Sequence, residues 1–167
     1  MTRAEPGFYK RPRYTAPRAK SISRPRMPDY SGPIPVPTPE TRPFWEAARR
    51  HELRLQRCRA CGQHFFYPRA AFPHCLSADV EWRRVSGRGT LHTFTVAYRG
   101  QKNFPLGSPY VIAIVELAEG PRLMTNLVGV DPDPAKLRIG MAVEVVFEDV
   151  SPEIALPRFR PAATSGR

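Results

Sequence analysis

Hydrophobic and polar positions alternate in short runs along the second half of the chain, with turn residues between the runs. Val143, Val145 and Phe147, for example, alternate with polar neighbours, as they do in a strand that buries one face. The runs predict strands over Trp82–Ser86 and Thr90–Tyr98, joined as one coiled strand, and then over Tyr110–Leu117, Arg122–Val130, Ala142–Val150 and Leu156–Phe159. Five strands in this order predict a small OB-fold barrel, and a six-stranded sandwich is the main structural rival.

A short helix and one further strand are predicted ahead of these runs. Thr41 is placed to cap the helix, Pro43 suits its first turn, and apolar side chains recur at helical spacing as far as His51. Leu53 and Leu55 then alternate with polar residues, which predicts a strand. The fold class expected from these patterns is therefore mainly β, with one helix before the first strand.

The predicted strand leads into a pair of cysteines that has the spacing of a zinc knuckle. Cys58 and Cys61 are separated by two residues, so both thiolates can bind one tetrahedral ion, and Gly62 lets the backbone turn afterwards. A zinc ribbon needs a second such pair. The candidate second knuckle contains Cys75 but carries Phe72 where the other thiolate should be.

Three thiolates leave the fourth ligand of a tetrahedral ion to be found. His64 and His74 are the candidates, because imidazole replaces thiolate in zinc sites. The alternative is that no metal binds and that aromatic side chains, Phe72 among them, fill the knuckle by hydrophobic packing. In either case we expect a helix and a zinc-ribbon module over residues 43–80, which the site stabilises, and the barrel over residues 81–161.

Residues 1–42 are predicted to form an extended arm that is rich in proline and positively charged. Ten of the 20 prolines lie before residue 44, which favours polyproline II geometry. The same stretch holds nine Lys or Arg against three acidic residues, about half of the net charge of +11, so the folded part itself gives little reason to expect nucleic acid as a partner. Spaced apolar residues favour docking of the arm on a partner over an idle leader, and residues 162–167 are expected to be a disordered tail.

Two simple counts bear on the compartment. No apolar run approaches the roughly 18 residues that span a bilayer, and the N-terminus has no signal-peptide stretch, so we expect a soluble, cytoplasmic protein without a membrane partner. Three cysteines cannot all be joined in intramolecular disulfides. In a reducing compartment, a close cysteine pair more often binds metal.

Several motifs in combination resemble one known family. They are Glu81-Trp82, Ser86-Gly87-Arg88-Gly89-Thr90, Pro109-Tyr110-Val111, Leu123-Met124-Thr125-Asn126-Leu127, Ile139-Gly140-Met141 and Leu156-Pro157-Arg158-Phe159, together with the cysteine knuckle. Over roughly residues 43–161 the chain resembles the zinc-ribbon and OB-fold family formerly catalogued as domain of unknown function 35. Members of that family carry two Cys-x2-Cys pairs, which this chain matches at Cys58, Cys61 and Cys75 and does not match at Phe72.

The resemblance implies that the chain is a non-catalytic subunit. Family members are non-catalytic partners of thiolase-superfamily enzymes, namely thiolases, acyltransferases and steroid side-chain aldolases, and some help to form the acyl-CoA site. For this chain it implies a zinc ion and a thiolase-fold catalytic subunit as partner, with a CoA thioester as the shared substrate of the complex. Whether the complex would form or cleave a carbon–carbon bond, or transfer an acyl group, does not follow from the motifs.

No catalytic residues are predicted from the sequence. The four histidines lie in no recognisable nucleophile or base motif, and no phosphate-loop or metalloprotease signature is present. Because CoA carries a 3′-phosphate and a pyrophosphate, Arg88, Arg99 and Lys102 are candidate CoA-binding cations, although a solvated basic loop explains them equally well.

The alternative function is binding of single-stranded nucleic acid, which OB barrels and zinc ribbons also perform. That function predicts aromatic and cationic side chains on the exposed faces of the second and third strands. Apart from Tyr110 and Arg122, these strands supply neither. They are instead expected to be surfaces that another protein covers.

Overall fold

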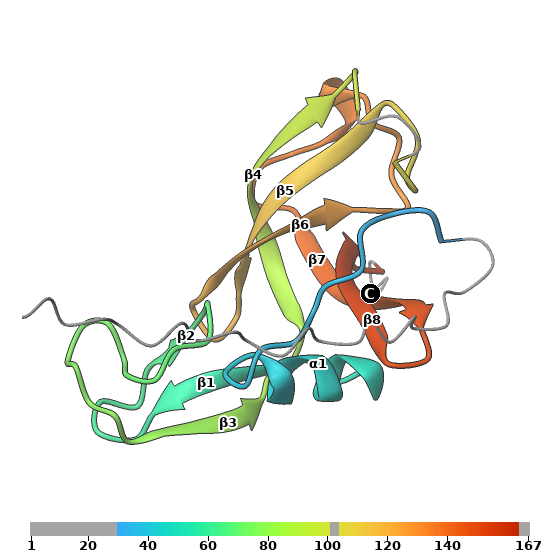
Figure 1. Ribbon diagram of the computed structural model, residues 1–167. Coiled ribbons are helices and arrows are strands. Elements are labelled where there is room, and N and C mark those ends of the chain that lie inside the picture. The colour runs from blue at the N-terminus through green and yellow to red at the C-terminus, as the bar shows by residue number, and fades with distance from the viewer. Residues whose placement is uncertain (1–29, 101–103, 164–167) are drawn as a thin grey trace, which may run out of the picture.

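A computed structural model describes residues 30–100 and 104–163 of the chain. Its sheet topology divides them into a three-stranded sheet and a closed five-stranded barrel. In Figure 1 the three-stranded sheet lies in the lower part of the picture and the barrel above it. Most of the predicted arm, residues 1–29, and most of the predicted tail, residues 164–167, lie outside the described residues. No helix in the described part reaches the length and hydropathy that a membrane crossing requires.

The barrel has the predicted number of strands, and its order is that of an OB fold. Its strands are β4 (Arg88–Ala97), β5 (Tyr110–Leu117), β6 (Arg122–Leu127), β7 (Ala142–Ser151) and β8 (Ile154–Pro161), with the 3-10 helix η1 (Pro134–Lys136) between β6 and β7. The order β4-β5-β6-β8-β7 closes on itself, and only β6 and β8 pair in parallel. The OB-fold prediction is confirmed, and the six-stranded sandwich is not what the chain forms.

The structure differs from the prediction at residues 82–86, which the strand pattern joins to the first barrel strand. Strand β3 (Val80–Arg84) instead pairs antiparallel with β1 (Arg54–Cys58), in the three-stranded sheet whose third member is β2 (His64–Phe65). The chain leaves this sheet at Gly87, which has a φ of +70°. A Cβ atom there would lie 2.3 Å from Cγ1 of Val145, so glycine is required where the chain turns into the barrel.

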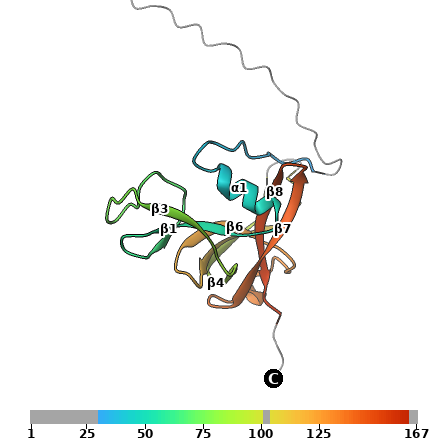
Figure 2. The ribbon, with the colours of Figure 1, turned by 90° about the horizontal axis from the view of Figure 1, so that it is seen from below.

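Helix α1 (Arg42–Arg49) lies between the two sheets, and Figure 2 shows it beside β8. It begins at the predicted place, with a proline in its first turn, and buries Phe44, Ala47 and Ala48. Thr41, however, does not cap the helix with its side chain; its hydroxyl oxygen accepts a hydrogen bond from the Thr38 amide instead (2.9 Å). The hydroxyl therefore stabilises the turn that leads into the helix.

One hydrophobic core joins the sheet of β1–β3 to the barrel. Leu53 and Leu55 from the β1 region belong to the same buried cluster as Leu91 and Phe159 from the barrel. The described end of the predicted arm also packs on the barrel, since Tyr30 is buried in a second cluster with residues 150 and 154. The relative position of ribbon and barrel is thus fixed by burial of apolar side chains.

Candidate functional site

The three cysteines meet at the end of the ribbon sheet that lies away from the barrel core. Cys58 ends β1, Cys61 lies in the loop before β2, and Cys75 lies in the loop between β2 and β3. The Sγ atom of Cys75 lies 3.6 Å from that of Cys58 and 4.0 Å from that of Cys61, and all three Sγ atoms fall within 4.8 Å of one another. A tetrahedral zinc ion with Zn–S bonds of about 2.3 Å separates its sulfur ligands by about 3.8 Å. The spacing of the thiols therefore fits a zinc ion.

The first cysteine loop has the backbone of a zinc knuckle. The Gly62 amide donates a hydrogen bond to the Cys58 carbonyl (2.8 Å), and the Cys58 amide donates to the Gln63 carbonyl (2.9 Å). Gly62 has a φ of +75°, a conformation that glycine adopts freely. The Cys61 amide donates a hydrogen bond to the Cys58 sulfur, and this is the main reason why the pKa of Cys58 is lowered to about 7. Zinc binds the thiolate, so the loop favours the form of Cys58 that binds metal.

The second loop repeats this backbone with a phenylalanine in place of the cysteine. The Leu76 amide donates to the Phe72 carbonyl (2.9 Å), and the Phe72 amide donates to the Ser77 carbonyl (2.9 Å). Leu76 has a φ of +58°, close to the value at Gly62. Phe72 is consequently the structural equivalent of Cys58. Its side chain is buried, and its ring lies 5.3 Å from that of Phe65.

Neither histidine proposed as fourth ligand belongs to the group of ligand atoms that the structure brings together, which contains only the three thiols among the described residues. The His74 ring lies 5.3 Å from the ring of Phe72, and His64 lies on β2. Burial lowers the pKa of His64, and the nearby Arg57 adds to the effect. The residues that would hold zinc are therefore Cys58, Cys61 and Cys75, and a zinc ion there would crosslink the two loops.

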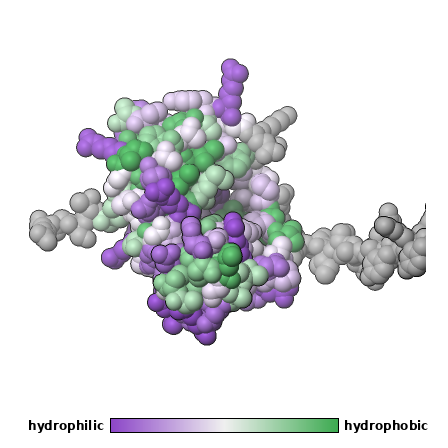
Figure 3. All heavy atoms as spheres, turned by 90° about the vertical axis from the view of Figure 1, so that its left-hand side faces the viewer, coloured by the Kyte–Doolittle hydropathy of each residue, from purple (hydrophilic) through white to green (hydrophobic). Residues whose placement is uncertain are grey.

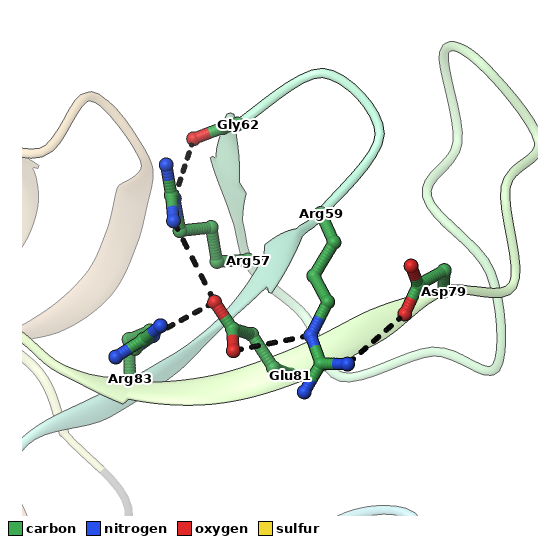
Figure 4. Close-up of polar contacts among 6 residues, drawn as sticks. All are labelled: Arg57, Arg59, Gly62, Asp79, Glu81 and Arg83. Carbon is green, nitrogen blue, oxygen red and sulfur yellow. Dashed lines mark hydrogen bonds and ion pairs between the residues drawn. The ribbon is translucent and has the colours of Figure 1, made fainter.

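An ionic network fixes the first loop to β3 (Figure 4). The Glu81 carboxylate pairs with Arg83 (2.7 Å), Arg59 (3.2 Å) and Arg57 (3.5 Å). Arg57 also donates a hydrogen bond to the carbonyl of Gly62 (2.9 Å). The neighbouring arginines, Arg83 first, lower the pKa of Glu81. The network holds one end of the cysteine loop and leaves a net positive charge on this face of the ribbon.

A cavity of about 370 Å³ lies where α1, the ribbon and the barrel meet. Its lining residues are mostly apolar, and they include Phe44, Trp45, Phe66, Tyr67, Leu123, Met124, Leu156 and Phe159. Two of them are open to solvent, Tyr67 with 54% and Met124 with 78% of their surface exposed. We call this feature the junction cavity. The sequence patterns give no sign of it, because its walls come from four separate segments of the chain.

A buried arginine supports one wall of the junction cavity. Only 7% of the Arg158 side chain is exposed, and its guanidinium pairs with Glu148 and donates a hydrogen bond to the Asn126 side chain (2.8 Å). Asn126 in turn donates to the Val111 carbonyl (3.2 Å). The network ties β8 to β7, β6 and β5. A lone arginine in a strand pattern gives no sign of burial, which explains why sequence reasoning does not single it out.

The outward face of β5 carries Ile112 and Ile114 between Tyr110 and Glu116, and on β6 the exposed Met124 follows Arg122. Ile112 and Ile114 alternate with fully buried residues, and Ile114 is paired with Met124 on β6. We call these three residues the outer barrel face. The one cation of these strands, Arg122, is bound to Glu116 (2.7 Å). On the described residues of β5 and β6, Tyr110 and Arg122 are thus the one aromatic and the one cationic side chain, which is no series on which nucleic-acid bases would stack.

The structure does not bring the proposed CoA-binding cations together. Arg88 begins β4, and Arg99 lies two residues beyond its end. A ten-residue strand separates residues at its ends by roughly 30 Å, so the two guanidinium groups serve different parts of the surface. Lys102 lies outside the described residues.

Comparison with known proteins matches both parts of the chain to one family. Residues 45–81 match the family described as "ChsH2, rubredoxin-like zinc ribbon domain", and residues 82–148 match "ChsH2, C-terminal OB-fold domain". The chain is 43% identical over 120 residues to a "Probable enoyl-CoA hydratase alpha subunit" of Thermomonospora curvata, which covers 71% of this chain but only 37% of that protein. It is 36% identical over 117 residues to a "DUF35 domain-containing scaffold protein" of Methanothermobacter thermautotrophicus, which covers 70% of this chain and 86% of the relative.

Two further similarities involve proteins of named complexes. The chain is 35% identical over 77 residues to "Benzoylsuccinyl-CoA thiolase subunit BbsA" of Geobacter metallireducens, which covers 46% of this chain and 51% of that protein. Among solved structures, it is similar to a chain of "Ltp2-ChsH2(DUF35) aldolase", with a TM-score of 0.69 and 39% identity, covering 78% of this chain and 100% of the other.

Proposed function

The chain belongs to the DUF35 family of zinc-ribbon and OB-fold proteins, and from this premise we propose that it is a non-catalytic accessory subunit of a thiolase-superfamily complex acting on acyl-CoA. The names of its relatives support the proposal, since they describe a scaffold protein, a CoA thiolase subunit and an aldolase complex. The catalytic groups belong to the thiolase-fold partner in this proposal, and the present chain contributes stability and part of the surface around the substrate.

The observation that carries the proposal is the apolar surface formed by the junction cavity and the outer barrel face. Met124 belongs to both, and with 78% of its surface exposed it is an unusual residue to leave in water. In Figure 3, hydrophobic side chains gather on the barrel in the upper part of the picture and on the ribbon in the lower part. Hydrophilic side chains lie between the two groups. Association with a second protein would remove such side chains from water, which is favourable.

His51 is the described histidine that makes a short contact with a carboxylate, and its surroundings are those of a surface residue. His51 and Asp149 form a histidine–carboxylate pair (3.0 Å), but the two side chains are 53% and 55% exposed. The His51 ring stacks on Phe147, with ring centroids 5.4 Å apart. Both side chains are open to water, so we assign this contact no catalytic role in the proposal.

Contact with the CoA phosphates remains part of the proposal for Arg88, Arg99 and Lys102. Since Arg88 and Arg99 lie at opposite ends of β4, they cannot both bind one phosphate group. The partner would therefore supply further donors to whichever phosphate each of them contacts. Changing each residue to Ala within the assembled complex, and measuring the affinity for acyl-CoA, tests them separately.

Co-purification tests the proposed complex. The full chain, tagged and purified from its native cells, is expected to bring down a thiolase-superfamily protein in constant stoichiometry through size-exclusion chromatography. Met124→Arg places a charge in the apolar surface and is expected to lower recovery of the partner at least tenfold. Ile139→Arg is the matched control, because Ile139 is 62% exposed and does not line the junction cavity.

Three outcomes contradict the proposal. Turnover of an acyl thioester by the isolated chain contradicts its non-catalytic role. Equal recovery of the partner by wild type and Met124→Arg contradicts the proposed docking surface. Tight, salt-resistant binding of a labelled single-stranded oligonucleotide, without a protein partner, would favour the nucleic-acid alternative.

A further inference from the structure

We propose that the ribbon binds zinc through the thiolates of Cys58, Cys61 and Cys75 and leaves the fourth coordination position to a ligand from outside the chain. Structural zinc sites are normally closed by four protein ligands, whereas an open position allows exchange of a bound water or another small donor. The inference concerns the ribbon alone and does not depend on the proposed thiolase partner.

The second loop preserves the backbone of a zinc knuckle. Phe72 makes the same two backbone hydrogen bonds as Cys58. In each loop, the carbonyl accepts from the residue four positions later and the amide donates to the residue five positions later, at 2.8–2.9 Å. The residue after each second cysteine, Gly62 or Leu76, has a positive φ of +75° or +58°. A leucine adopts that conformation at an energetic cost, so the turn is retained although the side chain does not favour it. The second loop is therefore a complete knuckle that lacks one ligand atom.

The thiols and imidazoles of the chain supply no fourth ligand in this arrangement. Every cysteine and histidine of the sequence lies in the described part of the chain. Two histidines are engaged elsewhere, His51 with Asp149 (3.0 Å) and His92 near Glu116 (3.8 Å). The other two lie outside the group formed by the three thiols. The described residues therefore hold no fourth thiolate or imidazole that is placed to bind the ion.

The three thiols are also accessible from one side. Cys61 and Cys75 are both exposed, and their sulfur atoms lie 4.0 Å apart, whereas Cys58 is buried with Phe72 on the inner side. An ion bound to these thiolates would have its Cys61–Cys75 edge at the surface, and an outside donor would have to reach it from that side, because the buried Phe72 ring covers the inner side. Water would complete the coordination of the ion in the isolated protein, and a small soft or borderline donor, a thiolate or an imidazole, would be able to displace it. A thiol that bound there would replace the water and release its proton to the solvent.

Cobalt substitution tests the open position, because the visible spectrum of tetrahedral Co²⁺ responds to each ligand. The full chain, reduced with a phosphine and kept free of oxygen, is expected to bind one zinc or one Co²⁺. Addition of imidazole, or of 2-mercaptoethanol in a second titration, is expected to shift the visible bands of the wild-type cobalt protein saturably. Phe72→Cys supplies the missing ligand at the position equivalent to Cys58. Its thiolate-to-metal absorption is expected to rise roughly 1.3-fold, the ratio of four thiolates to three, and its spectrum to stop responding to added ligands.

His74→Ala is the matched control for an internal ligand. If the site is open, this variant keeps the wild-type spectrum and the wild-type response to imidazole. The proposal is overturned if the wild-type spectrum does not respond to added ligands, or if it responds only after His74→Ala. It is also overturned if the wild-type chain binds no metal. Should Phe72→Cys fail to fold, the titrations of the wild-type chain still distinguish an open site from a closed one.

Discussion

Gly87 is the residue at which the chain passes from the ribbon sheet into the barrel, and its replacement by alanine is expected to be strongly destabilising. An alanine at a φ of +70° costs about 1–2 kcal/mol in backbone conformation. Its Cβ would in addition lie 2.3 Å from Cγ1 of Val145, an overlap that the packed core relieves at a cost of about 1–3 kcal/mol. Together, these effects predict that Gly87→Ala lowers the free energy of unfolding by about 2–5 kcal/mol.

A matched variant separates the two costs. Gly107 has the same φ of +70°, but a Cβ there would meet no atom within 4 Å. Gly107→Ala is therefore expected to show the conformational cost alone, and the difference between the two variants measures the contact with Val145. Adding Val145→Ala to Gly87→Ala should recover part of the lost stability, as a double-mutant cycle quantifies.

Urea denaturation of the full chain gives the required free energies. Trp82 on β3 and Trp45 on α1 provide fluorescence signals from the part of the chain before the turn, and circular dichroism reports on the barrel strands. Equal destabilisation by Gly87→Ala and Gly107→Ala would refute the reasoning, because it would mean that the side chain of Val145 imposes no restriction on residue 87.

Three further expectations concern the ribbon and the barrel. Cys75→Ser is expected to reduce the zinc content of the purified chain by at least tenfold, as measured by elemental analysis, since two thiolates remain. Arg158→Met is expected to cost about 1.5–3 kcal/mol in urea denaturation, because it leaves Glu148 without its charged partner, whereas Arg160→Met, at an exposed pair with Glu144, is expected to cost less than about 1 kcal/mol. The lowered pKa of Glu81 means that its arginine contacts stabilise the fold above the unfolded pKa of about 4.3 and lose that effect as the pH falls through the lower folded value. Thermal melts between pH 3 and 7 should therefore depend less on pH in Glu81→Gln, and an unchanged profile would contradict this contribution.

The sequence predicts the barrel strands well because short apolar or alternating runs are separated by turn residues. Strand β5 is predicted at its observed bounds, Tyr110–Leu117, from a run of apolar residues between two turns. The same pattern cannot tell which strand is the neighbour of another. For that reason it places residues 82–86 in the barrel, whereas β3 pairs with β1 and the chain joins the barrel only at Gly87, whose carbonyl accepts a hydrogen bond from the Val145 amide (2.8 Å).

In the candidate site, too, only the features formed by residues close together in the sequence could be predicted. The spacing of Cys58 and Cys61, and the departure at Phe72, are visible in the sequence. The equivalence of Phe72 and Cys58 is visible only in the backbone hydrogen bonds of the two loops. The junction cavity could not be predicted at all, because Trp45, Tyr67 and Met124 come from distant segments that only the folded chain brings together.

The division of the buried residues has a consequence for how the ribbon opens. Leu55 belongs to the cluster that extends into the barrel, whereas Cys58, three residues further along the same strand, belongs to a small separate cluster with Phe65 and Phe72. We therefore expect the part of β1 around Leu55 to unfold together with the barrel, and the part around Cys58 to open separately. Chelation of a bound metal would loosen the outer loops, which include Tyr67 of the junction cavity, while Leu55 stays folded with the barrel, so the barrel side of the proposed docking surface, with Met124, would survive the loss of the ion.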